Sequence, residues 1–111
     1  MDSRCTLKKN SDFRRLYNKG KSAVGPCMVI YCRRNGLGVN RLGYTVSTKL
    51  GGAVVRNRIR RRLREVYRLN CSQLKSGYDL VVVARARAQG ADFKKLQEGF
   101  MKSCRELGIA L

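Results

Sequence analysis

The stretch YDLVVVARA, Tyr78–Ala86, decides the fold of this 111-residue chain. It contains the apolar run LVVV (Leu80–Val83), and β-branched valines favour an extended backbone. An apolar run this short, without alternating polar residues, is typical of a strand that is buried on both faces. The sequence therefore predicts a sheet that holds this strand, with helices packed against the sheet.

Further strands are expected on the N-terminal side of this run. CMVIYCR (Cys27–Arg33) is dense in β-branched and aromatic residues, and LGYTVS (Leu42–Ser47) is predicted as the following strand. Between them, RNGLGVN (Arg34–Asn40) has two glycines and two asparagines, which predict a hairpin loop. A short edge strand near Ser22–Val24 brings the expected sheet to four strands.

A first helix is predicted over Ser11–Lys19. We expect Ser11 or Asp12 to cap its beginning and Gly20 to end it. Its apolar positions fall at helical spacing on one face, and they are Phe13, Leu16 and Tyr17.

A last helix is predicted in ADFKKLQEGFMKSCREL (Ala91–Leu107), with Asp92 as its cap and Gly108 just past its end. Its apolar face is formed by Phe93, Leu96, Phe100, Cys104 and Leu107. With a further helix before Tyr78, the order of elements is helix, strands, helix, strand, helix. This order indicates an α/β or α+β sandwich in one domain that spans residues 1–111.

The middle helix is predicted in VVRNRIRRRLREVYRLN (Val54–Asn70). It follows Gly51-Gly52, where regular secondary structure is expected to be interrupted. On a helical wheel its apolar residues form a core-facing stripe of Val55, Ile59, Leu63, Val66 and Leu69, with Tyr67 just beyond. The opposite side carries Arg58, Arg60, Arg61, Arg64 and Arg68. Arg62 falls near the apolar stripe, so its stem must pass the core edge or follow a neighbouring element.

The charge of this helix indicates an anionic partner. Arg56, Arg60, Arg64 and Arg68 form an i,i+4 ladder of like charge, which destabilises an isolated helix. Arginine also matches phosphate oxygens with two parallel hydrogen bonds. The whole chain has 25 Lys+Arg against 7 Asp+Glu, a net charge of +18. Nucleic acid is the first candidate partner and an anionic membrane surface the second.

The sequence offers little apparatus for catalysis by this chain alone. It has no histidine, no carboxylate pair suited to acid–base or two-metal work, and no phosphate-binding glycine loop. Its five cysteines lack metal-ligand spacing, which predicts buried or half-buried thiols in a reducing compartment. No apolar run is long enough for a membrane span and no signal-peptide core is present, so we expect a cytoplasmic protein.

At this point the residues resemble a known family, the protein subunit of bacterial ribonuclease P. The resemblance is carried by TVSTKLGGAVVRNRIRRRLREVYR (Thr45–Arg68) with its R-N-R at Arg56-Asn57-Arg58, and by LKKNSDFRRLY (Leu7–Tyr17) and YDLVVVAR (Tyr78–Arg85). It implies an αβββαβα sandwich of one mixed four-stranded sheet and three helices, like a ribosomal-protein domain. It also implies a left-handed βαβ crossover, where the general rule favours a right-handed one.

The resemblance further implies that an RNA subunit carries catalysis with magnesium at the RNA active site, and that the protein binds no cofactor by itself. The implied partners are the catalytic RNA and the single-stranded 5′ leader of precursor tRNA, with no membrane and no stable protein partner. The implied contacts to catalytic RNA are Arg56, Asn57, Arg58, Arg60, Arg61, Arg64 and Arg68. The implied contacts to the leader are Phe13, Tyr17 and Tyr31, with Lys49 at the rim of the cleft.

Other interpretations stay open on the residues alone. On the residues alone, plain core packing is the favoured interpretation of Phe13 and Tyr17. A ribosomal or other structural RNA-binding protein shares the charge pattern, and a nuclease that acts alone is a further alternative. A DNA-binding protein is less well supported, because beyond Asn57 the exposed helix face has little Asn or Gln for reading base edges.

Overall fold

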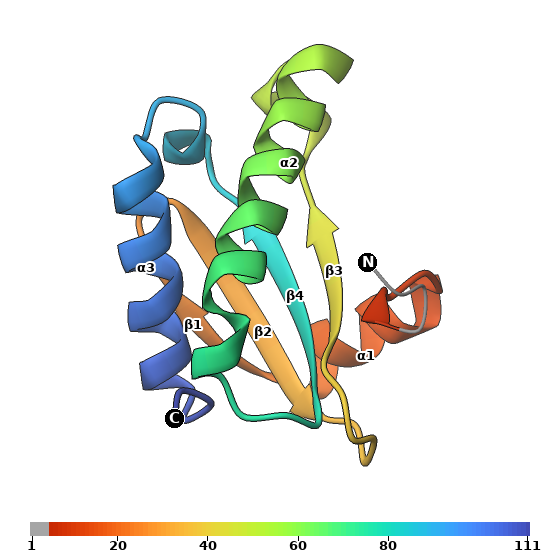
Figure 1. Cartoon of the computed structure of the whole chain (residues 1–111). Helices are drawn as coiled ribbons and strands as arrows, with labels where there is room; N and C mark the ends of the chain where they lie inside the picture. The colour runs from red at the N-terminus through yellow and green to blue at the C-terminus, as the bar shows by residue number, and fades with distance from the viewer. Residues whose placement is uncertain (1–4) are drawn as a thin grey trace.

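A four-stranded sheet with the order β1-β2-β4-β3 runs through the middle of the molecule (Figure 1). The computed structural model describes residues 5–111. The main elements are α1 (Asn10–Lys19), β1 (Lys21–Val24), β2 (Met28–Arg34), β3 (Arg41–Thr45), α2 (Ala53–Asn70), β4 (Tyr78–Ala84) and α3 (Phe93–Glu106). Short 3₁₀ helices lie at η2 (Thr48–Leu50), η3 (Cys71–Gln73) and η4 (Ala86–Ala88). The predicted αβββαβα order is confirmed.

Strand β4 lies inside the sheet, as its apolar run predicted. It pairs antiparallel with β2, where Ile30 faces Val82, and parallel with β3, where Gly43 faces Val81. Leu80 is buried on one face and Val81 on the other. The predicted hairpin between β2 and β3 is wrong, because β4 lies between these two strands. The strand that is apolar on both faces takes the inner position, and β3 is left at the edge.

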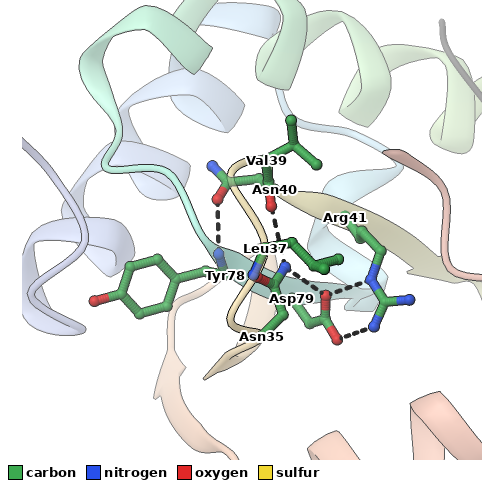
Figure 2. Close-up of polar contacts among 7 residues, drawn as sticks. All are labelled: Asn35, Leu37, Val39, Asn40, Arg41, Tyr78 and Asp79. Atoms are coloured by element: carbon green, nitrogen blue, oxygen red, sulfur yellow. Dashed lines mark hydrogen bonds and ion pairs between the residues drawn. The ribbon is translucent and has the colours of Figure 1, made fainter. Parts of the chain in front are cut away.

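The loop between β2 and β3 is held by polar contacts to the start of β4 (Figure 2). The Asn35 side chain donates to Asp79 Oδ1 at 3.0 Å, and the Tyr78 amide donates to Asn40 Oδ1 at 2.9 Å. Arg41 donates two hydrogen bonds to the Asp79 carboxylate, from Nε at 2.8 Å and from Nη2 at 2.6 Å. The two asparagines therefore fix a loop that crosses over the start of β4 instead of a hairpin turn.

The β3–α2–β4 connection is a left-handed crossover. In Figure 1 β3 and β4 point the same way, α2 covers the face toward the viewer, and β4 lies to the left of β3. This is the handedness that the family resemblance implied, and it departs from the general preference for right-handed crossovers.

The two faces of the sheet carry different clusters. Helices α2 and α3 cover one face, where the main core includes Ile30, Leu42, Leu80, Val82, Leu63 and Phe100. Helix α1 covers the other face, where a smaller cluster consists of Leu7, Leu16 and Val81 with Phe13, Tyr31 and Val83 packed against it. Across residues 5–111, no helix combines the length and apolar character that spanning a bilayer requires.

The ends of the outer helices test the predicted caps. Asp92 caps α3, because its Oδ1 accepts a hydrogen bond from the Lys95 amide at 2.8 Å. Gly108 follows α3 with a φ of 76°, as a glycine after a helix often does. The predicted cap of α1 is wrong: the helix begins at Asn10 after Lys9, with no side-chain cap bond, and Asp12 lies in its first turn.

Candidate nucleic-acid interface

The buried side of α2 largely follows the predicted stripe. Ile59, Leu63 and Val66 are buried. The expectation for Leu69 is wrong, because Leu69 is 48% exposed and Asn70 is buried in its place. The Asn70 amide donates to Val66 O at 2.7 Å and to Gln97 Oε1 of α3 at 3.2 Å. A polar contact to the neighbouring helix therefore decides the last turn of the stripe.

The arginines of α2 divide into an exposed and a half-buried group. Arg58, Arg61, Arg64 and Arg68 are exposed together with Asn57, whereas Arg56, Arg60 and Arg62 are half-buried. Arg62 donates to the carbonyl oxygens of Ala88 at 3.4 Å and Ala91 at 2.5 Å, so its stem follows a neighbouring element as predicted. Arg62 is thus committed to holding the loop before α3.

Arg68 differs from the rest of the like-charge ladder. Its Nε donates to Glu65 Oε2 at 3.0 Å, and its Nη2 contacts the other carboxylate oxygen. The hydrogen bonds from Arg68 lower the pKa of Glu65 below its usual value. Arg56 and Arg60 donate to uncharged acceptors instead, Gly51 O and Asn57 Oδ1, each at 3.2 Å. The uncompensated charge of the ladder therefore lies toward the beginning of α2.

Three predicted aromatic residues come together beside α1. The rings of Tyr17 and Tyr31 lie edge to face with centroids 5.0 Å apart. The Tyr17 hydroxyl is 2.8 Å from Thr45 Oγ1 on β3. Phe13 lies against Gly43, where an added Cβ would be only 2.6 Å from Phe13 Cζ. The hydrogen side chain at Gly43 is what allows this ring to lie on the strand.

Two hollows open around Phe13 at the edge strand β3. The first has a volume of about 340 Å³ and is lined by Thr6, Leu7, Phe13, Leu42, Gly43, Tyr44, Arg60 and Arg64. The second has a volume of about 360 Å³ and is lined by Asn10, Phe13, Tyr17, Tyr44, Thr45, Val46 and Arg60. Phe13, Tyr44 and Arg60 line both, so the aromatic side of α1 and the basic side of α2 meet around β3. We call this surface the β3-edge cleft.

The predicted site residues are not all brought to this cleft. Phe13, Tyr17, Arg60 and Arg64 line it. Tyr31 reaches it only through its ring contact with Tyr17. Lys49 is exposed on η2 and lines neither hollow. Asn57, Arg58 and Arg61 point to solvent from α2, outside both hollows.

Tyr44, which was not predicted from the sequence as a site residue, lines both hollows and packs against the main core. The Arg64 guanidinium carbon lies 5.9 Å from the centre of its ring, within the range of a cation–π contact. Its hydroxyl is buried with no hydrogen-bond partner among residues 5–111, and burial raises the pKa of this hydroxyl. The available signal was its place in LGYTVS, directly before Thr45. Adjacent strand residues face opposite sides of the sheet, so Tyr44 and Thr45 are expected to face different helices.

The cysteines are unpaired and mostly enclosed. Cys27, Cys32 and Cys104 are buried and Cys5 is half-buried, as predicted, whereas the expectation is wrong for Cys71, which is exposed. Burial raises the pKa of Cys104 to about 12 and also raises that of Cys32, so these two thiols stay protonated at neutral pH. Within the described part of the chain, no three Cys, Asp or Glu residues gather into a group that could hold a metal ion.

Comparisons with known proteins agree on one family. The sequence model of the family described as Ribonuclease P matches residues 1–108. The chain is 49% identical over 96 residues to the ribonuclease P protein component of Caldanaerobacter subterraneus, covering 86% of this chain and 83% of that protein. It is 45% identical over 97 residues to that of Natranaerobius thermophilus, covering 87% and 84%.

Solved structures give the same result. The structure of the Staphylococcus aureus RNase P protein superposes with a TM-score of 0.86 at 33% identity, covering 96% of this chain and 98% of that one. The Thermotoga maritima RNase P protein superposes with a TM-score of 0.81 at 32% identity, covering 87% and 92%.

Proposed function

This chain belongs to the ribonuclease P protein family, and on that premise we propose how its surfaces are divided between two RNA ligands. The chain is the protein subunit of a ribonucleoprotein endonuclease that processes tRNA. We propose that the catalytic RNA docks on α2 and that the single-stranded 5′ leader of precursor tRNA lies in the β3-edge cleft.

The observation that carries this proposal is the sharing of Phe13, Tyr44 and Arg60 by both hollows. An aromatic surface and a basic surface that meet at one strand edge suit two RNA strands held side by side. The docking surface consists of Arg56, Asn57, Arg58, Arg60, Arg61, Arg64 and Arg68. The leader surface consists of Phe13 and Tyr17, with Tyr31 supporting the Tyr17 ring and Lys49 as a more distant cation.

The chemistry of each surface matches its ligand. Arginine forks bind phosphate oxygens in pairs and position RNA without reading its sequence. Aromatic rings such as Phe13 stack on unpaired bases, at about 1–3 kcal/mol per base, and tolerate any sequence. The hydrogen bond between the Tyr17 hydroxyl and Thr45 Oγ1 on β3 holds the Tyr17 ring in place, so that the cleft is formed before the leader binds.

We assign no catalytic step to this chain. The RNA subunit carries the reaction, with magnesium at the RNA active site. The net charge of +18 contributes by reducing the repulsion between the two RNAs, which lowers the magnesium concentration that the reaction needs. We place the particle in the cytoplasm, where a reducing environment suits five unpaired cysteines.

The test is cleavage of precursor tRNA by the cognate catalytic RNA at low magnesium, with and without the protein. We expect strong stimulation by the wild-type chain and weak stimulation by a variant with Arg60→Ala and Arg64→Ala. The protein freed of RNA is the control and should cleave nothing. If the wild-type chain gave no stimulation, the proposed division of labour would be refuted, and cleavage by RNA-free protein would indicate an independent nuclease.

A further inference from the structure

A second basic groove lies along α3, away from the β3-edge cleft. It has a volume of about 940 Å³ and lies between the exposed side of α3, the loop that follows β4 and the turn between β1 and β2. We call it the α3 groove. Its cations are Arg87, Lys95 and Lys102, and its only acidic residue is Glu98. None of its lining residues takes part in the surfaces proposed above.

The cations of the α3 groove are available to a ligand. Lys95 and Lys102 are seven residues apart on one helix, which places them about 10 Å apart along its axis. Arg87 lies across the groove from them on η4. All three are exposed, and no ion pair or side-chain hydrogen bond within residues 5–111 engages their charged groups. The groove thus presents positive charge on both walls.

Gly99 opens the helical wall of the groove at a position where neither the packing nor the backbone conformation of the described residues requires a glycine. Gly99 lies in the interior of α3, where glycine destabilises a helix relative to alanine. A Cβ added at Gly99 would meet no atom within 4 Å, and its φ is not positive. The same holds for Gly90, which also lines the groove. Neither the fold nor the packing of the described residues requires these glycines, whereas a ligand that approaches the backbone closely would.

The lining indicates what kind of ligand fits. The α3 groove has no aromatic residue, so it lacks the stacking surface that single-stranded bases use and that Phe13 and Tyr17 supply elsewhere. Helical RNA is recognised instead by its shape, through phosphates and 2′-hydroxyls. Cations on both walls suit the phosphates, and Glu98 suits a 2′-hydroxyl, which can donate a hydrogen bond to its carboxylate.

The groove also continues from the arginine helix. Gln89 lines the α3 groove and also a smaller hollow beside α2 that includes Arg58 of the R-N-R sequence. The loop that carries Gln89 is tied to α2 by the hydrogen bonds from Arg62 to Ala88 and Ala91. Gln89 therefore borders both the α3 groove and the hollow beside the beginning of α2, so the two regions are neighbours on the surface.

We infer that the α3 groove binds the sugar–phosphate backbone of a base-paired segment of the catalytic RNA. The inference rests on the proposed function, because it takes the catalytic RNA as the ligand of α2. It adds a contact region on α3 and assigns roles to Lys95, Lys102 and Gly99.

The first experiment measures binding of the full chain to the cognate catalytic RNA at several salt concentrations. Each phosphate contact adds about 0.7–0.9 to the slope of log K against log salt, as known from DNA. Lys95→Gln with Lys102→Gln should therefore weaken binding and reduce that slope by about 1.4–1.8. The matched control is Lys94→Gln with Arg105→Gln, which removes the same charge from exposed positions on α3 outside the groove. Equal slopes for the two double variants would overturn the inference.

The second experiment uses Gly99→Ala, for which the inference predicts opposite effects on stability and binding. The Tm of the free protein should rise by about 2–6 °C, because alanine favours the helix. Affinity for the catalytic RNA should fall several-fold, because the added methyl group lies where the RNA backbone approaches. A rise in Tm with unchanged affinity would count against the groove as an RNA site.

Backbone footprinting of the catalytic RNA then identifies the bound segment. The Lys95→Gln, Lys102→Gln variant should lose protection over a base-paired stretch that the wild type protects, and loss confined to unpaired nucleotides would overturn the assignment. If the wild type fails to bind, or the Arg60→Ala, Arg64→Ala variant binds as tightly as the wild type, the proposed function itself fails. If those two behave as proposed while the groove variants match their control, only the groove assignment fails, and an acidic protein segment becomes the better ligand.

Discussion

The sheet face under α2 and α3 is closed by two helices, whereas the opposite face is covered by α1 together with Leu7 (Figure 1). On the closed face Ile30, Leu80 and Val82 are at most 1% exposed. On the other face the buried cluster is limited to Leu7, Leu16 and Val81, and Tyr17 remains 39% exposed.

This difference separates stability from binding within one small domain. The closed face buries most of the apolar residues, so the free energy of unfolding depends mainly on it. The face under α1 has enough burial to fix the helix but leaves ring edges and hydroxyls at the surface. A chain of this size can thus hold aromatic side chains ready for a ligand without exposing its main core.

The largest effect is expected from truncating a phenylalanine on the closed face. Phe100 is 1% exposed and its ring lies edge to face with Tyr67 at 6.4 Å. Phe100→Ala should lower the free energy of unfolding by roughly 3–5 kcal/mol, measured by urea denaturation. Phe13→Ala is the matched control on the other face and should cost clearly less. Equal losses would break the distinction between the two faces.

A somewhat smaller effect is expected at the edge where the two surfaces meet. Removing both Arg60 and Arg64 should weaken binding of the catalytic RNA by roughly 1.5–3 kcal/mol, because charged hydrogen bonds to phosphate are lost. The slope of log K against log salt should also fall by about 1.4–1.8. A control with Arg34→Ala and Arg105→Ala removes equal charge from exposed sites outside the cleft. A salt slope that matches the control would argue against phosphate contacts at Arg60 and Arg64.

Phe13→Ala should act on the leader and spare the rest of the substrate. Loss of one stacking ring should weaken binding of leader-bearing precursor tRNA by about 1–3 kcal/mol, with mature tRNA unaffected. The measurement is the affinity of the reconstituted particle for both RNAs. Equal losses for precursor and mature tRNA would refute the leader assignment.

Gly43→Ala tests the same ring without removing it. The new methyl group would lie 2.6 Å from Phe13 Cζ, so the ring must move off β3. We expect a loss of leader affinity in the same direction as for Phe13→Ala and no larger. Gly38→Ala, at a glycine with nothing within 4 Å, is the control and should leave leader binding unchanged. Normal leader affinity in Gly43→Ala would show that the position of Phe13 does not matter.

The parts of the fold that depend on local pattern were predicted from the sequence. The strand at Tyr78–Ala84 and the helix capped by Asp92 are periodic and carry their own boundary signals. Arg62 was expected to leave the exposed face because its angle on the helix places it beside the core, and it does. These features need only the geometry of one element.

The features that were missed depend on contacts between elements. The order of β3 and β4 is a choice among distant pairings, so the asparagines of Arg34–Asn40 were interpreted as a hairpin turn when they bind the start of β4. Asn70 is buried because it meets Gln97 of another helix. The sharing of Arg60 between two surfaces was not predictable, because α1 and α2 cover opposite faces of the sheet and residues of both meet in the hollows at the edge of β3.

The smallest effect is expected for Tyr17→Phe, which separates the role of the Tyr17 hydroxyl from that of its ring on the face under α1. The hydroxyl of Tyr17 bonds to Thr45 on β3, while the ring meets Tyr31. Removing only the hydroxyl should cost about 0.5–1.5 kcal/mol of folding stability and leave the ring contact in place. Because stacking uses the ring, leader affinity should change little, whereas Tyr17→Ala should lower it toward that of Phe13→Ala. A large loss of leader affinity in Tyr17→Phe would mean that the hydroxyl itself contacts RNA, and the face under α1 would then bind the leader by hydrogen bonding as well as by stacking.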